Sequence, residues 1–263
     1  MLLNNKVILI SGVGSGMGRE MALAFAREGA DVAVASRNTD YLATVAAEVA
    51  ELGRRALPVA TDVSQADQRE ALIAAVRETF GHLDVLVNNA AHPGDRKGFL
   101  DGDLVRWRKT MEINLWVPLE LTRLCLALMQ GRDARVIMIN AGGSGLPAPK
   151  GPVDEESGPV RSTAYTLSKH ALASATRFLA AELAPLGVRV NGIHPGPIGG
   201  EHLFDAMDRE AAQRGISTDQ ARREWSERTT LGYVTPAAEI ARTAVYLASD
   251  MARPITGQSI GVQ

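Results

Sequence analysis

The stretch that decides the fold lies near the N-terminus and reads Ser11-Gly12-Val13-Gly14-Ser15-Gly16-Met17-Gly18. It follows a short apolar run and precedes a helical pattern. Gly12 permits a tight turn, Gly16 lets a pyrophosphate approach the backbone, and Gly18 allows a helix to pack closely on a strand. The N-terminus of that helix offers free N–H groups and a partial positive charge. These features predict a dinucleotide-binding loop at the start of a βαβ unit.

Short apolar runs alternate with longer helical patterns in the rest of the chain. The expected strands are Lys6–Ile10, Asp31–Ala35, Ala56–Ala60, Leu83–Val87, Arg135–Ile139, Val188–Ile193 and Ile255–Val262. The expected helices are Gly16–Glu28, Thr39–Leu52, Gln65–Phe80, Leu104–Gln130, Ala164–Ala184 and Pro236–Ser249. Most of the strand runs lack a period of two, which is typical of strands covered on both faces. The alternation predicts one α/β domain over residues 1–263, with a parallel sheet and right-handed crossovers.

The composition points to an enzyme that acts on small molecules. The chain has 263 residues, 46% of them apolar, and a formal net charge of −2, so it has no strong field for nucleic acid or anionic membrane. Its single cysteine, Cys125, cannot form an internal disulfide, and no Cys/His spacing suggests a metal site. The N-terminus does not resemble a signal peptide, and no apolar run is long enough for a membrane span. We therefore expect a cytoplasmic protein.

Two regions interrupt the alternation of strands and helices. Residues 141–163 are rich in Gly, Pro and Ser, and residues 199–230 are charged and show a helical pattern. Both follow the carboxyl end of an expected strand, the edge where open α/β sheets bind their ligands. We expect substrate loops, with residues 199–230 forming a lid; the alternative is that both are tolerated surface insertions.

The end of the second expected strand bears on the choice of cofactor. It reads Ala35-Ser36-Arg37-Asn38 and has no acidic residue. A free ribose 2′-hydroxyl is held by a carboxylate at this place, whereas a 2′-phosphate requires a cation. Arginine binds phosphate in bidentate fashion, so the sequence favours NADP(H) over NAD(H). The alternative is a solvated arginine at a strand end.

A pair of proton-handling side chains opens the helix after the fifth strand. Tyr165 and Lys169 are four residues apart and share one helix face. A nearby ammonium lowers the pKa of a phenol, which could then exchange a proton with a carbonyl or alcohol oxygen while a hydride moves at the nicotinamide. Such pairs also occur on ordinary amphipathic helices, and only the placement in a dinucleotide fold favours catalysis.

Taken together, the motifs resemble those of the short-chain dehydrogenase/reductase family from end to end. They are Gly12-xxx-Gly16-x-Gly18, Asp62-Val63, Asn88-Asn89-Ala90, Asn114, Tyr165-xxx-Lys169, Asn191, Pro195-Gly196 and Thr256-Gly257-Gln258. The resemblance implies a seven-stranded, doubly wound Rossmann sheet and assembly as a homotetramer or homodimer. It also implies a helix kink and a water held at Asn114, within a proton relay through Lys169.

The motifs and the resemblance together imply two sets of site residues. The catalytic set is Asn114, Ser144, Tyr165 and Lys169. The cofactor-binding set is Gly12, Ser15, Gly16, Met17, Gly18, Ser36, Arg37, Asp62, Val63, Asn89, Ala90, Tyr165, Lys169, Pro195, Gly196 and Ile198.

Several residues depart from the family pattern. The serine that normally ends the fifth strand is replaced by Ala141, and Ser144 is the candidate substitute as oxyanion donor. Gly200 stands where a threonine usually helps to hold the nicotinamide. These departures leave a second hypothesis open: a non-catalytic NAD(P)-binding redox sensor of the same fold. The intact Asn114, Tyr165 and Lys169 argue for the enzyme.

Overall fold

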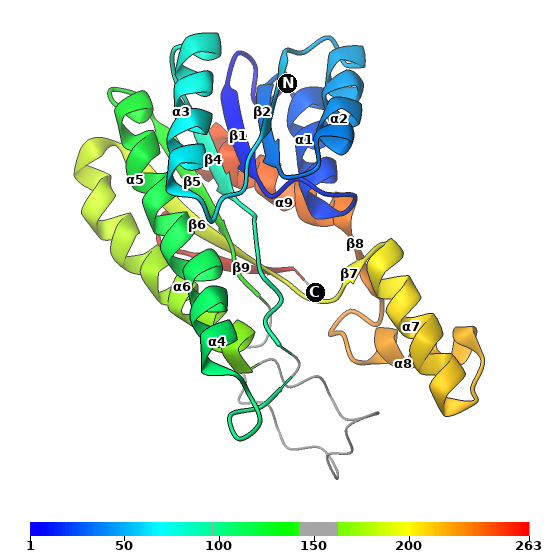
Figure 1. The fold of residues 1–263 in the computed structure, drawn as a ribbon. Coiled ribbons are helices and arrows are strands. Elements are labelled where there is room, and N and C mark those ends of the chain that lie inside the picture. The colour runs from blue at the N-terminus through cyan, green and yellow to red at the C-terminus, as the bar shows by residue number, and fades with distance from the viewer. Residues whose placement is uncertain (96, 142–162, 263) are drawn as a thin grey trace.

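A seven-stranded parallel sheet forms the centre of the molecule. The structure is a computed structural model that describes residues 1–95, 97–141 and 163–262 (Figure 1). The strands are β1 (Val7–Ser11), β2 (Asp31–Ser36), β3 (Ala56–Ala60), β4 (Val85–Asn88), β5 (Ala134–Ile139), β6 (Val188–Pro195) and β9 (Ser259–Val262). Their order in the sheet is β3-β2-β1-β4-β5-β6-β9. The expected doubly wound sheet is confirmed, although its last strand is shorter than predicted.

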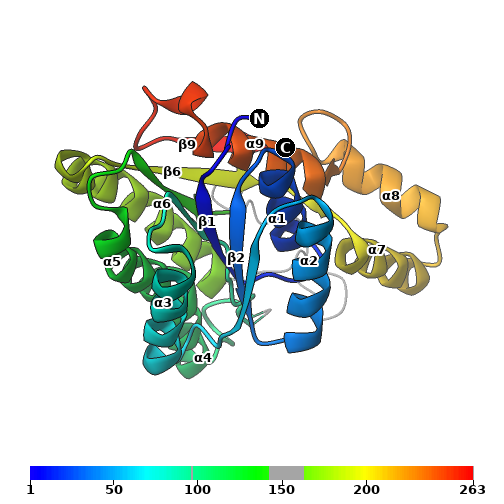
Figure 2. The ribbon, with the colours of Figure 1, turned by 90° about the horizontal axis from the view of Figure 1, so that it is seen from above.

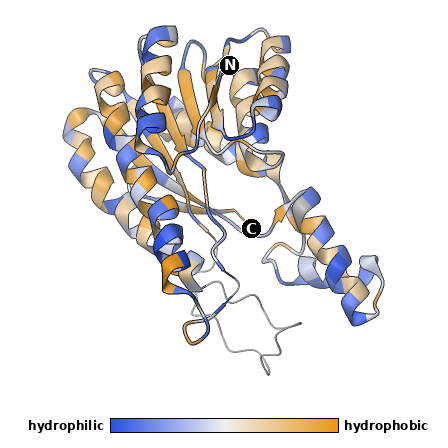
Figure 3. Cartoon of the chain, in the orientation of Figure 1, coloured by the Kyte–Doolittle hydropathy of each residue, from blue (hydrophilic) through white to orange (hydrophobic). Residues whose placement is uncertain are grey.

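Helices cover both faces of the sheet because both faces are apolar. One layer contains α1 (Met17–Arg27), α2 (Thr39–Glu51) and α9 (Ala237–Ala248), and the other contains α3 (Ala66–Phe80), α5 (Val117–Met129) and α6 (Thr163–Leu183). Successive side chains of β1 show the division: Ile8 and Ile10 pack in the first layer, Val7 and Leu9 in the second. Figure 2 shows the two helix layers on opposite sides of β1 and β2. Figure 3 shows hydrophobic residues concentrated in these central strands.

The helix expected over residues 104–130 is interrupted by a π-helical turn. It comprises α4 (Leu104–Met111), the π turn η1 (Glu112–Trp116) and α5. Pro118, at the start of α5, has no N–H, so it cannot donate the usual helical hydrogen bond to the carbonyl of Asn114 four residues earlier. The register widens where that bond is missing. The irregularity therefore includes Asn114, the residue at which a helix kink was expected.

The insertion after β6 is a pair of helices on a short stem. It contains α7 (Glu201–Arg214) and α8 (Thr218–Glu227), as the helical pattern predicts. Two strands that were not predicted, β7 (Ile198–Gly199) and β8 (Thr235–Pro236), pair with each other and bring the two ends of the insertion together. They are too short to give a sequence pattern. Short 3-10 turns, η2 (Ala184–Leu186) and η3 (Asp250–Ala252), complete the described elements.

Within the described ranges, no helix combines the length and apolar character needed to cross a bilayer.

Candidate active site

The glycine-rich loop is fixed against the end of β4. Gly12 has a φ of +74°, and a Cβ built on it would lie 2.4 Å from the Cα of Ala90, so only glycine fits this turn. Asn89 donates its side-chain amide to the Gly12 carbonyl at 2.6 Å. A Cβ on Gly18 would lie 2.8 Å from the Cα of Val13. The tight turn and the close helix packing expected of this loop are both confirmed.

The other side of the loop faces open space. No atom lies within 4 Å of a Cβ built on Gly14 or Gly16. The helix α1 begins directly after Gly16, so its first N–H groups lack helical partners and are directed to this region. An open backbone beside a helix N-terminus suits a phosphate group.

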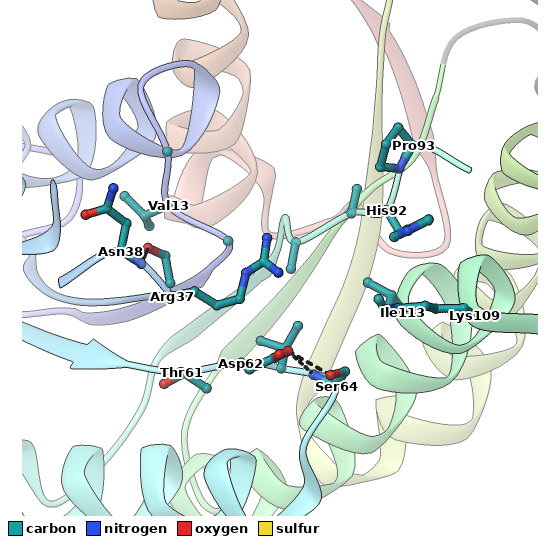
Figure 4. Close-up of a pocket in the computed structure, with 16 residues that line it drawn as sticks. Val13, Arg37, Asn38, Thr61, Asp62, Ser64, His92, Pro93, Lys109 and Ile113 are labelled. Atoms are coloured by element: carbon teal, nitrogen blue, oxygen red, sulfur yellow. Dashed lines mark hydrogen bonds between the residues drawn. The ribbon is translucent and has the colours of Figure 1, made fainter. Parts of the chain in front are cut away.

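A cavity of about 610 Å³ adjoins the loop at the carboxyl ends of β1, β2, β3 and β4 (Figure 4). Its lining residues are Gly12, Val13, Gly14, Ser36, Arg37, Asn38, Thr61, Asp62, Val63, Ser64, Ala90, Ala91, His92, Pro93, Lys109 and Ile113. The predicted cofactor residues Gly12, Ser36, Arg37, Asp62, Val63 and Ala90 are therefore brought together on one wall. Val63 and Ile113 offer apolar surface for a base, and the remaining residues are mostly polar.

The other predicted cofactor residues do not line this cavity. Asn89 holds the glycine loop, and Met17 and Ile198 pack against the hydrophobic core. Gly196 donates its N–H to the carbonyl of Val262 at 2.9 Å, which ties the end of β6 to β9. Residues that the sequence analysis missed include Lys109, which lies four residues before Ile113 on one helix face. That spacing was the available signal.

Helix α6 places the predicted catalytic residues Tyr165 and Lys169 together. The Lys169 Nζ lies 5.8 Å from the centroid of the Tyr165 ring and donates to the carbonyl of Ile139 at 2.7 Å. The lysine side chain is only 3% exposed, and burial lowers its pKa from 10.5 to about 8. The proximity inferred from the four-residue spacing is present.

The phenol pKa does not follow the sequence-based expectation. An ammonium neighbour was expected to lower the pKa of Tyr165, but burial raises it above its ordinary value of 10. The Lys169 ammonium donates its hydrogen bond to the Ile139 carbonyl, and burial is the cause that raises the phenol pKa. Tyr165 is therefore a neutral phenol at physiological pH, the form that donates a proton.

The side chain of Asn114 connects the π turn to two other segments. Its Oδ1 accepts the N–H of His92 at 2.7 Å, and its Nδ2 donates to the His92 carbonyl and to the Ser168 Oγ, each at 2.9 Å. Ser168 in turn donates to the carbonyl of Tyr165 at 2.7 Å. Asn114 is fully buried, so the network is shielded from water. It holds the loop after β4 against the start of the catalytic helix.

The ends of β5 and β6 form the remaining part of the site. His194 donates its Nδ1–H to the carbonyl of Ala141 at 2.8 Å, which supports a structural role for this histidine. Ala141, His194 and Lys169 line a second cavity of about 410 Å³ between α6 and β9. Ala141 itself has no side-chain donor. Ser144, the candidate substitute for the strand-end serine, lies outside the described residues.

Comparisons with known proteins agree with this architecture. The family model described as Enoyl-(Acyl carrier protein) reductase matches residues 12–263. A short-chain dehydrogenase/reductase of Aspergillus oryzae is 32% identical over 99% of this chain and 94% of its own length. An actinorhodin polyketide ketoreductase solved with NADPH has a TM-score of 0.84 and 30% identity, covering 98% of this chain and 95% of that one. L-sorbose reductase from Gluconobacter frateurii, solved with NADPH and L-sorbose, has a TM-score of 0.87 and 26% identity over 100% and 97% of the two chains.

Proposed function

We infer the reaction from the premise that this chain belongs to the short-chain dehydrogenase/reductase family, and is thus an NAD(P)-dependent oxidoreductase acting on CH–OH or C=O groups. We propose that it uses NADP(H) and that its substrate is a carbonyl compound or the corresponding secondary alcohol. The observation that carries the proposal is the pair formed by the partly buried Tyr165 and the buried Lys169, which is held at the carboxyl end of β5 by the bond from Lys169 to Ile139. A protein that only binds nucleotide has no need of such a pair.

The residues present fit a dinucleotide. The space beside Gly14 and Gly16 would accept the pyrophosphate, Val63 and Ile113 would flank the adenine, and Arg37 would bind a 2′-phosphate. The nicotinamide would lie near Pro195 and Ile198. When bound, the cofactor would supply or accept the hydride.

The protein's own task is to move one proton at the substrate oxygen. The neutral phenol of Tyr165 would donate this proton to a carbonyl oxygen as the hydride reaches the carbon. Lys169 would hold the phenol side of the site electropositive, and the Asn114 side chain would keep the loop after β4 in register with α6.

A substrate screen that follows NADPH absorbance tests this function. Steady oxidation of NADPH with at least one ketone or aldehyde supports the enzyme. The relatives act on chemically different molecules by their names, so the panel should include sugars and polyketide-like ketones. Tight NADPH binding with no turnover on any member would favour the redox-sensor alternative.

Arg37→Glu is expected to weaken NADPH binding about 100-fold while changing NADH binding by no more than about threefold. The variant replaces a phosphate ligand with a carboxylate that repels the 2′-phosphate, whereas NADH presents only hydroxyls there. Dissociation constants from nicotinamide fluorescence give the comparison. Equal losses for both cofactors would contradict the proposed preference for NADP(H).

We propose that the helical pair α7 and α8 covers the substrate. Arg214 donates to Glu224 at 2.7 Å and the Trp225 indole donates to Glu210 at 2.9 Å, and these two bonds join the helices. Arg214 also donates to Glu210 within α7 at 2.9 Å. The β7–β8 stem holds the two ends of the insertion together after β6. The pair could then move over the substrate as one unit.

We also propose a symmetric homo-oligomer, either a tetramer or a dimer. Large apolar side chains are exposed on the outer helices: Trp116 is 52% exposed, Leu167 52% and Phe178 67%. Such a surface is costly in water and suits packing against a copy of itself. Light scattering is expected to give a mass of two or four chains, and Phe178→Glu should lower it. A monomeric mass for the unmodified protein at working concentration would contradict this proposal.

A further inference from the structure

Two cations without partners line the cofactor cavity. Arg37 reaches it from the end of β2, and Lys109 comes from α4 on the other side (Figure 4). Neither side chain forms an ion pair or hydrogen bond with another residue of the described ranges. Most other arginines near the sheet are paired, as Arg19 is with Glu48 at 2.5 Å. The two free cations therefore share one cavity.

The acidic residue of the cavity wall is already occupied. Among the described lining residues Asp62 is the one acid, and its Oδ1 accepts the N–H of Ser64 at 3.0 Å and the Ser64 hydroxyl at 2.8 Å. Asp62 is thus held as a turn acceptor and forms no ion pair with either cation. Its single negative charge leaves the described wall with a net positive charge.

The positive charges of Arg37 and Lys109 both act on the pKa values of Asp62 and His92, which lie on different loops. Hydrogen bonds from Ser64 are the main reason that the pKa of Asp62 is lowered, and the charges of Arg37 and Lys109 lower it further. Burial is the main reason that the pKa of His92 is lowered, and both cations again add to the effect. Gly94 donates its N–H to the His92 Nδ1 at 3.1 Å, so the neutral ring carries its proton on Nε2. His92 therefore adds a neutral donor and no compensating charge.

We propose that Lys109 is a second phosphate-binding residue of the nucleotide site, acting on the dinucleotide from the wall opposite Arg37. The inference rests on the proposed function, because it takes NADP(H) as the ligand of this cavity. A dinucleotide with a 2′-phosphate brings three phosphate groups into the site. One arginine and a helix N-terminus leave part of that charge unmatched, and the flexible ammonium of Lys109 can supply a point charge to either phosphate position.

A matched pair of substitutions on α4 tests the role. Lys109→Met removes the charge and keeps the length of the side chain. Arg108→Met does the same at the adjacent residue, which faces the outer groove with Leu104 and Trp107. Dissociation constants for NADPH, NADH, 2′,5′-ADP and 5′-AMP are measured for both variants at low and high salt. We expect NADPH to bind about tenfold more weakly to Lys109→Met and within about twofold of normal to Arg108→Met.

The nucleotide series identifies which phosphate Lys109 binds. A loss confined to NADPH and 2′,5′-ADP assigns it to the 2′-phosphate, and a parallel loss for NADPH and NADH assigns it to the pyrophosphate; either result supports the proposal. High salt should reduce the difference in NADPH affinity between the wild type and Lys109→Met, because salt screens the charge of the lysine. Unchanged affinities, or equal losses in the two variants, would overturn it. If the wild type binds neither NADPH nor NADH, the proposed function fails as well.

Discussion

Tyr165→Phe is expected to reduce kcat by about 10³-fold while leaving the dissociation constant for NADPH within a factor of about two. The substitution removes only the phenolic oxygen, and a positioned general acid contributes a rate factor of this order. Tyr165 is partly buried on α6, and the ring would keep its packing as phenylalanine. Steady-state kinetics with any active substrate give kcat, and fluorescence titration with NADPH gives the dissociation constant.

Tyr246→Phe is the matched control for this experiment. Tyr246 is also partly buried, but it lies on α9, on the opposite face of the sheet. Its variant should keep full activity. If Tyr165→Phe retained wild-type turnover, Tyr165 would not be the acid and another donor would have to protonate the substrate.

Lys169→Met is expected to abolish turnover and, at the same time, to make the cofactor-free protein more stable. Burial lowers the pKa of Lys169 from 10.5 to about 8, so the protein at pH 7 carries a charge that its interior disfavours by roughly 3 kcal/mol. Methionine fills a similar volume without charge. The substitution also removes the hydrogen bond from Lys169 to the Ile139 carbonyl, which costs about 1 kcal/mol. The net gain in the free energy of unfolding is expected to be ~2 kcal/mol.

The pH dependence of this gain has a definite sign. The pKa of Lys169 in the folded protein lies below its ordinary value, so the folded protein binds fewer protons than the unfolded chain between pH 8 and 10.5. The wild type therefore gains stability as pH rises through this interval, and below it the penalty is constant. The advantage of Lys169→Met should be complete at pH 7 and nearly gone at pH 10. Thermal unfolding of both proteins at several pH values measures it.

Lys109→Met provides the control for stability. The Lys109 side chain is exposed and should show neither the gain at pH 7 nor its loss at higher pH. A Lys169→Met variant that is less stable than wild type at pH 7 would show that the buried ammonium is favourably paired. The prediction that the Lys169 charge destabilises the folded protein would then be wrong. The predicted role of Lys169 in catalysis would still be tested by the loss of turnover.

Some parts of the candidate site could be inferred from short spacings. Gly12 and Gly18 were correctly assigned to a tight turn and a close packing contact, because the turn and the contact of Gly18 with Val13 lie within the β1–α1 connection. The close approach of Gly12 to Ala90 at the end of β4 depends on the tertiary structure. The π turn at Asn114 has a local signal in Pro118, four residues later. The Tyr165–Lys169 pair follows from helical geometry alone. Interactions within about four residues are fixed by backbone periodicity, so the sequence is sufficient for them.

What depended on distant segments could not be inferred in the same way. Three features depend on contacts between distant segments or on burial. They are the raised pKa of the Tyr165 phenol, the hydrogen bonds of Asn114 with His92 and Ser168, and the shared cavity of Arg37 and Lys109. The sequence by itself determined the sheet, its helix layers and the identity of the reactive groups, because alternating apolar runs encode burial locally. The tertiary structure alone decided their electrostatics, because desolvation and charge–charge energies depend on distances that no local pattern contains.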